Sequence, residues 1–263
     1  MTTAILSALP EEQGGLVQAL EQREQFQYAG REFWRGRLHG QMVVLGLSGI
    51  GKVAAATTAT VLLERLGVQR IVFTGVAGGM GEGVQVGDVV VATQFLQHDM
   101  DASPIFPRWE VPGYGCTQFF CDPVLSAALF ESASAYLANA KAGCASQSSE
   151  ITRIRATRVH QGLVVSGDRF VSTLAESAAL RTVLAAAGYQ VLAVEMEGAA
   201  VAQVCHDFGK PFAAVRIISD RADDSAHVDF PRFIREVVQP YADHIIAGFL
   251  QRQAVGLHRI KNE

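Results

Sequence analysis

Short runs rich in valine and isoleucine alternate along this chain with longer stretches rich in alanine and leucine. The short runs are typical of buried strands, and the longer stretches carry apolar residues at helical spacing, so we expect crossover helices, and not hairpins, between the strands. This alternation predicts an α/β fold: a mixed, mostly parallel central sheet flanked by helices, in a three-layer sandwich. The expected strands are Ala4–Ala8, Met42–Leu47, Arg70–Thr74, Asp88–Thr93, Arg158–Val165, Val191–Val194 and Phe212–Ile218, and the expected helices are Val53–Leu66, Pro123–Ala140, Leu174–Ala187, Gly198–Phe208 and Phe230–Gln251.

The 263 residues are expected to form one domain, because a single sheet covered by helices on both faces commonly reaches this length. Two segments interrupt the alternation. Asp101–Gly115 is rich in proline and aromatic residues, and the segment 143–155 is polar and rich in serine, so both are predicted to be surface loops or insertions. The first is a candidate lid, since aromatic side chains such as Trp109 are costly to expose without a cover.

The composition excludes several classes of function. A formal net charge of −4 argues against nucleic acid or a membrane as the partner, because both attract basic surfaces. The first apolar run ends at Pro10 and follows no basic segment, so we expect no signal peptide and a cytoplasmic protein. The cysteines show no metal-ligand spacing and are expected to be reduced, so neither a metal nor another cofactor is expected.

Two glycine-rich segments resemble nucleotide-binding motifs but depart from them at deciding positions. Gly46–Lys52 matches the frame of a phosphate-binding loop, yet Val53 follows where a hydroxyl must reach magnesium. In Gly75–Gly87, Val84 occupies the place of the third glycine of a dinucleotide motif. Both segments follow predicted strands, so we expect tight turns whose backbone N–H groups approach a small ligand.

Acidic residues follow the predicted strands at four places, 8–12, 166–170, 195–198 and 218–223. In an open α/β sheet, ligands usually bind just beyond the carboxyl ends of the strands. These segments also carry a family resemblance. The chain is similar over nearly its whole length to the 5′-methylthioadenosine/S-adenosylhomocysteine nucleosidases of the nucleoside phosphorylase superfamily, in the segments Glu11–Glu12, Ser48–Ala56, Thr74–Gly79, Val86–Asp88, Val165–Phe170, Ala193–Glu197 and Arg216–Asp220.

The resemblance implies hydrolysis of the N-glycosidic bond of 5′-methylthioadenosine, S-adenosylhomocysteine or both, in methionine salvage. Adenine is a poor leaving group, so an acid must protonate its N7, and by resemblance that proton comes through Asp220. Glu12 would activate the attacking water, and Glu197 would bind the ribose hydroxyls and stabilise an oxocarbenium-like sugar. Structural roles stay open for all three: a helix N-cap for Asp220, an acid in the first turn of a helix for Glu12, and a buried partner of Arg216 for Glu197.

The resemblance also implies the residues that bind the substrate. Phe170 would stack on adenine and the backbone of Val171 would read its edge, while Met196 and Phe230 would contact the ribose or the alkylthio tail. The three large apolar side chains are equally compatible with ordinary core positions. Glu195 is expected to point to the opposite face of its strand from the ribose-binding carboxylate and to support the site. The remaining expected contacts are Leu9, Ile50, Val76, Ala77, Gly78 and Ser219.

Some features depart from the family pattern. Val76 stands where members usually have a small hydroxyl residue, and the Asp101–Gly115 loop and the 143–155 insertion differ from the compact bacterial pattern. At the foot of the first loop, His98 and Asp99 are expected to act as a hinge or interface and not in catalysis. These departures therefore affect the expected contact with the sugar or the water and the specificity for the tail of the substrate.

Two other functions remain compatible with the sequence. A phosphate-dependent nucleoside phosphorylase would need clustered arginines, for which Arg216 is a candidate, and its release of adenine would depend on phosphate. A non-catalytic nucleoside-binding relative would bind the nucleoside and release no adenine. The family pattern and the aromatic content of Asp101–Gly115 further predict a homodimer in which this loop helps to close the neighbouring subunit's pocket.

Overall fold

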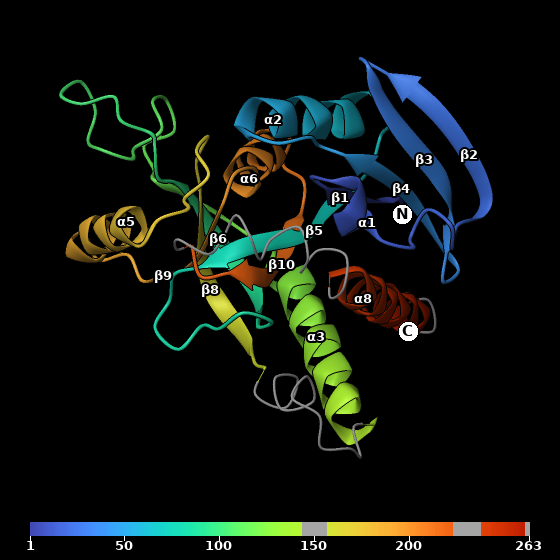
Figure 1. Cartoon of the computed structure of the whole chain (residues 1–263). Helices are drawn as coiled ribbons and strands as arrows, with labels where there is room; N and C mark the ends of the chain where they lie inside the picture. Colours follow the sequence, from blue (N-terminus) through green and yellow to red (C-terminus); the bar gives the residue numbers. More distant parts are fainter. Residues whose placement is uncertain (144–156, 223–237, 261–263) are drawn as a thin grey trace.

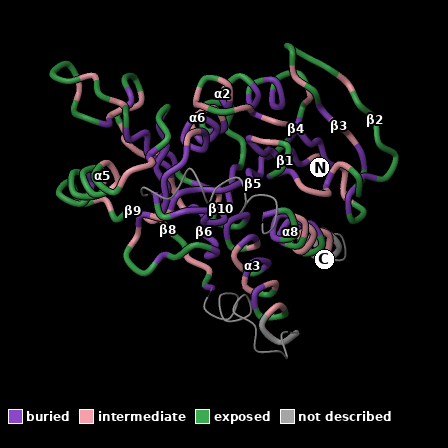
Figure 2. Tube along the Cα trace, in the orientation of Figure 1, coloured by how far each residue is buried: buried purple, intermediate pink, exposed green. Residues whose placement is uncertain are grey.

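The computed structural model describes residues 1–143, 157–222 and 238–260 (Figure 1). Its centre is a ten-stranded mixed sheet, most of whose inner strands are buried, as the purple trace in Figure 2 shows. All seven strands predicted from the apolar runs are present. The strands are β1 (Thr3–Ser7), β2 (Glu21–Tyr28), β3 (Arg31–Leu38), β4 (Gln41–Leu47), β5 (Arg70–Gly79), β6 (Val89–Gln97), β7 (Gln118–Phe120), β8 (Val159–Ser166), β9 (Val191–Glu195) and β10 (Phe212–Asp220).

The strand pairing brings the ends of β5, β9 and β10 together. The neighbours β4, β1, β5 and β10 are parallel, as are β6, β8 and β9. Antiparallel pairing of β10 with β6 and of β5 with β9 joins the two parallel sets and closes a ring of strands. Within this ring Gly78 of β5 is aligned with both Asp220 of β10 and Val194 of β9.

Helices cover both faces of the sheet, as predicted for a three-layer sandwich (Figure 1). The helices α2 (Lys52–Thr60) and α6 (Gly198–Asp207) share one apolar core with the sheet, and α3 (Pro123–Gly143) and α8 (Gln239–Ile260) share a second. The helix α5 (Leu174–Ala186) buries Leu184 near β9. None of the described helices combines the length and the apolar character that crossing a lipid bilayer requires.

Most helix boundaries lie close to the predicted ones. The predicted helix Val53–Leu66 is α2 together with a wider final turn, η1 (Val61–Arg65), in which the N–H of Leu66 donates to the carbonyl of Val61 at 3.1 Å. The predicted helix Phe230–Gln251 overlaps α8. The structure describes α8 from Gln239 onward, and the second residue of this helix is a proline. Its expected first part, including Phe230, lies outside the described residues.

The antiparallel hairpin β2–β3 was not predicted, and the expectation of crossover helices in place of hairpins is wrong for this part of the sheet. Seven of the eight residues of β2 are exposed, and the strand carries glutamate, glutamine and arginine side chains. A pair of antiparallel strands at the edge of a sheet needs no apolar run, because its residues are exposed to solvent. The apolar pattern that revealed the inner strands is therefore absent here.

The Asp101–Gly115 segment is a loop, as predicted, but Trp109 does not need an external cover. This side chain is 6% exposed, its indole Nε1 donates to the carbonyl of His98 at 3.0 Å, and its ring meets Tyr189 edge-on at 5.7 Å. In contrast, Ile105 in the same loop is 82% exposed. The predicted insertion 143–155 lies, from residue 144 onward, outside the described residues.

Candidate active site

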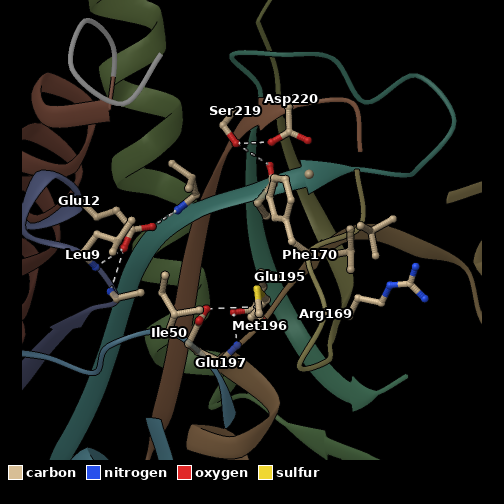
Figure 3. Close-up of a pocket in the computed structure, with 16 residues that line it drawn as sticks. Leu9, Glu12, Ile50, Arg169, Phe170, Glu195, Met196, Glu197, Ser219 and Asp220 are labelled. Carbon is tan, nitrogen blue, oxygen red and sulfur yellow. Dashed lines mark hydrogen bonds between the residues drawn. The ribbon is translucent and has the colours of Figure 1, made fainter. Parts of the chain in front are cut away.

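A cavity of about 380 Å³ lies where β1, β5, β9 and β10 end. Figure 3 shows Glu12, Glu197 and Asp220 approaching it from three sides. The volume is in the range of pockets that bind small molecules. Apart from Phe230, every site residue predicted from the sequence lines this cavity, whose lining is Ala8, Leu9, Glu12, Ile50, Val76, Ala77, Gly78, Arg169, Phe170, Val171, Val194, Glu195, Met196, Glu197, Ser219 and Asp220.

Backbone N–H groups from β5 and from the segment between β1 and α1 hold Glu12 in place. It lies in the short helix α1 (Pro10–Gln13) directly after β1, where its Oε2 accepts hydrogen bonds from the N–H groups of Ala8 and Leu9, both at 2.8 Å. Its Oε1 accepts from the N–H of Val76 at 2.9 Å. A side chain at Gly75 would place its Cβ 2.8 Å from Oε1, so only glycine leaves room for this carboxylate. Glu12 thus both stabilises the start of α1 and reaches the cavity.

Burial raises the pKa of Glu12 above its ordinary value, since only 3% of the residue is exposed. The three backbone N–H groups and the positive charge of Arg216 act in the opposite direction without cancelling the effect of burial. A carboxylate with a raised pKa is a stronger proton acceptor than an exposed one. The environment of Glu12 therefore suits a general base.

The buried cation Arg216 forms an ion pair with Glu195. Its Nη2 donates to Glu195 Oε2 at 2.8 Å, and its guanidinium lies 4.2 Å from the ring centre of Phe73. Glu195 also accepts from the N–H of Gly198 and from the hydroxyl of Ser166. The alternative in which Arg216 is the ion-pair partner of Glu197 is therefore wrong.

Glu197 is the N-cap residue directly before α6, and it lines the cavity. Its Oε1 accepts from the N–H of Gly51 at 2.8 Å, a contact that the sequence pattern did not predict. Burial and the nearby charge of Glu195 raise the pKa of Glu197 to about 8, against the opposing effects of the Gly51 N–H and Arg216. A carboxyl group with this pKa is largely protonated near neutral pH.

Asp220 ends β10 and is 2% exposed. Its Oδ2 accepts from the hydroxyl of Ser219 at 2.7 Å, and its Oδ1 accepts from the N–H of Ala222 at 2.8 Å. The second bond closes a tight turn of the kind that aspartate side chains commonly form. A Cβ at Gly78 would lie 3.0 Å from Oδ1, so the glycine allows β5 to pass close to the carboxyl group.

Apolar side chains form the mouth of the cavity. Phe170 is 44% exposed and Ile50 is 59% exposed, although both line the cavity. Phe170 is therefore not an ordinary core residue. Val76 contributes its backbone N–H to Glu12, so this position contacts the carboxylate through its main chain.

The described part of the site lacks the charge pattern of a phosphate pocket. Among the described cavity residues the only arginine is Arg169, whose guanidinium bonds to Glu176 and whose side chain is 76% exposed. Arg216 is committed to Glu195. Nor do the described histidine, cysteine, aspartate and glutamate residues form a group that could hold a metal ion.

Comparisons with known proteins agree with this arrangement. Residues 2–251 match the family model of the phosphorylase superfamily. The 5′-methylthioadenosine/S-adenosylhomocysteine nucleosidase of Bacillus thuringiensis is 36% identical over 247 residues, which cover 94% of this chain and 97% of that protein. The chain belongs to this nucleosidase family.

Solved structures of similar proteins extend the family comparison. The nucleosidase of Neisseria meningitidis, solved in complex with methylthio-immucillin-A, aligns with a TM-score of 0.82 and 31% identity over 95% of this chain and 99% of its own. Futalosine hydrolase of Helicobacter pylori aligns with a TM-score of 0.80 and 28% identity, covering 96% of this chain and 98% of its own. The fold of this nucleosidase family member is therefore shared by enzymes named for different nucleosides.

Two supporting groups of this family member were missed by the sequence reasoning. One is the N–H of Gly51, which binds Glu197, and the other is the hydroxyl of Ser166, which accepts from the N–H of Ala199 at 2.8 Å while donating to Glu195. Both residues lie inside segments that carry the family resemblance. The signal was thus present, but their partners lie far away in the sequence.

Proposed function

We propose that this protein hydrolyses the N-glycosidic bond of 5′-methylthioadenosine, S-adenosylhomocysteine or both, and releases adenine and the thioribose product. The observation that carries the proposal is the convergence of Glu12, Glu197 and Asp220 on one cavity with Phe170 at its mouth. The relatives that bear the nucleosidase name align over nearly the whole chain and support it.

The proposed reaction divides the work among the three carboxyl groups. Adenine N7 receives a proton through Asp220, and the electron pair of the C1′–N9 bond leaves with the base. Glu197 accepts hydrogen bonds from the ribose hydroxyls and stabilises the positive charge that develops on the sugar. A water oxygen then bonds to C1′ from the other face and gives its proton to Glu12, whose raised pKa favours this transfer.

The apolar residues account for the rest of the nucleoside. Phe170 offers a ring face to the adenine, and the backbone of Val171 lies beside it to read the edge of the base. Leu9, Ile50 and Met196 line the part of the cavity that suits an alkylthio tail, because thioether and aliphatic groups pack favourably against sulfur. Phe230 remains a predicted contact, since it lies outside the described residues.

The decisive experiment is a substrate panel read out as adenine release, with and without inorganic phosphate. The panel contains 5′-methylthioadenosine, S-adenosylhomocysteine, 5′-deoxyadenosine and a futalosine-type nucleoside. We expect adenine from the first two without added phosphate. Release that required phosphate would identify a phosphorylase, and tight binding without release would identify a non-catalytic relative.

The pKa of Glu197 makes nucleoside binding depend on pH. Ribose hydroxyls donate best to the ionised carboxylate, so the affinity should increase as the pH rises through about 8, the value to which burial and Glu195 raise this pKa. Calorimetry from about pH 6 to about pH 10, roughly two units on either side of that value, should show this with an adenine C-nucleoside, whose carbon–carbon bond resists hydrolysis. Glu197→Gln should bind more weakly and lose the dependence, whereas Glu131→Gln on the exposed face of α3 should keep it. An unchanged pH profile in Glu197→Gln would refute the assignment.

The proposed activity also suggests how the protein assembles and where it works. We propose a cytoplasmic homodimer that acts in methionine salvage, with the Asp101–Gly115 loop closing the neighbouring subunit's pocket. The exposed Ile105 in this loop and the exposed Ile50 beside the pocket support a contact between copies. A sizing experiment on the active enzyme tests the dimer, and a fully active monomer would contradict it.

A further inference from the structure

An ionic cluster outside the cavity joins three segments that are distant in sequence. The Nζ of Lys52, at the start of α2, lies 2.5 Å from Asp99 Oδ1 and 4.0 Å from Asp168 Oδ2. It also donates to Gln97 Oε1 at 3.1 Å. The side chain of Lys52 is only 15% exposed, so this cation is held more firmly than a lysine in an ordinary surface ion pair.

Backbone bonds tie the same residues together. The N–H of Lys52 donates to Asp168 Oδ1 at 2.7 Å, which places a carboxylate at the N-terminus of α2, where the helix dipole favours negative charge. The N–H of Asp168 donates to Asp99 Oδ2 at 2.8 Å. Burial raises the pKa of Asp99, but the bonds from Lys52 and Asp168 outweigh it and leave this pKa below its ordinary value. The carboxylate of Asp99 is therefore held in its charged form.

Each end of the cluster is adjacent to a group at the cavity. Gly51, directly before Lys52, donates its N–H to Glu197, and Phe170 follows Asp168 by two residues. Gly51 has a φ of 94°, in the region that favours glycine, and a Cβ there would lie 3.1 Å from Asp168 Oδ1. The loop thus adopts a conformation in which its backbone faces both Asp168 and Glu197.

We propose that Lys52, Asp99 and Asp168 form a positioning cluster that holds the Gly51 N–H against Glu197 and the Phe170 segment against the base, so that the sugar and base subsites keep a set distance. The inference rests on the proposed nucleosidase activity. The three residues touch no substrate and act only through Gly51 and the segment that carries Phe170. Misplacement of a contact group by about 1 Å can cost roughly 100-fold in rate, so such a cluster matters for turnover.

Replacing the cation tests the cluster. Lys52→Met should lower kcat/KM roughly 10- to 100-fold, and Lys52→Arg should restore part of the loss, because it keeps the charge. The Gly51 N–H lowers the pKa of Glu197, which is also influenced by Glu195, Glu12 and Arg216. If that bond weakens, the acidic limb of the pH profile of kcat/KM should move to higher pH. A merely structural loss would reduce the rate without moving the limb.

A second variant and a control keep the test independent of folding defects. Asp168→Ala removes a half-exposed acceptor and should give the same shift, and its effect should not add fully to that of Lys52→Met, since both break one network. Arg252→Met removes the cation of an exposed ion pair with Glu131 and should leave rate and profile unchanged. Wild-type kinetics and pH limb in both cluster variants would overturn the proposal, as would a rate loss without a shift of the limb.

Adenine binding separates failure of this inference from failure of the proposed function. Calorimetric titration with adenine alone should show a several-fold weaker affinity in Lys52→Met and Asp168→Ala than in the wild type or Arg252→Met. If the wild-type protein released no adenine from any nucleoside, the proposed function would fail, while weaker adenine binding in the two variants would still support the cluster. Equal adenine affinities in all four proteins would overturn it.

Discussion

Replacing Asp220 with asparagine is expected to reduce the turnover of 5′-methylthioadenosine by about 10²- to 10⁴-fold, the usual contribution of a general acid. The substitution removes the group through which adenine N7 is protonated and leaves the side-chain volume unchanged. Asparagine can still accept from the N–H of Ala222 with its carbonyl oxygen, and its amide can donate to Ser219 in place of the present bond from that hydroxyl. Initial rates of adenine release at saturating substrate measure the effect.

The matched control for this variant is Asp122→Asn. Asp122 caps the start of α3 by accepting from the N–H of Leu125 at 2.9 Å, and asparagine caps helices about as well as aspartate. The control should keep wild-type turnover, and both variants should unfold near the wild-type temperature. If Asp220→Asn kept full activity, its role as proton donor would have to be abandoned.

Replacing Glu12 with glutamine is expected to cause a loss of similar size in hydrolysis, about 10²- to 10⁴-fold, because the attacking water loses its proton acceptor. Nucleoside binding should change much less, since the residues that face the base and the ribose remain. In the wild type the rate should fall as the pH decreases through the raised pKa of Glu12, because the protonated group cannot accept a proton. Single-turnover kinetics together with binding calorimetry separate the two effects.

Folding must be checked in this variant because Glu12 accepts from three backbone N–H groups. Glutamine would turn one amide N–H₂ toward a backbone donor, and an unsatisfied buried group costs about 1–3 kcal/mol. A thermal unfolding curve measures that cost, and Glu11→Gln, on the exposed neighbour, is the control for both stability and rate. Normal hydrolysis in a folded Glu12→Gln protein would exclude the water-activating role.

The inner strands were predictable because burial leaves a local signal. The strands β1, β5 and β10 are buried along almost their whole length, and each contains a run of apolar residues. The acidic residues that follow them stood out for the same reason. The exposed hairpin β2–β3 carries no such run, and its existence depends on pairing with the edge of β4.

The candidate site was also predictable only in part, because some of its features depend on local sequence patterns and others on long-range contacts. The sequence by itself determined that Glu12, Glu197 and Asp220 stand near strand ends, because strand periodicity and acidic interruptions are visible within a few residues. Only the tertiary structure decided that Arg216 pairs with Glu195 and that Gly51 binds Glu197 across 146 residues of chain. Both contacts, and the pKa of about 8 that Glu197 acquires from burial and charge, depend on how distant strands meet. Residue periodicity reports which side of an element is buried, but not which distant residue lies against it.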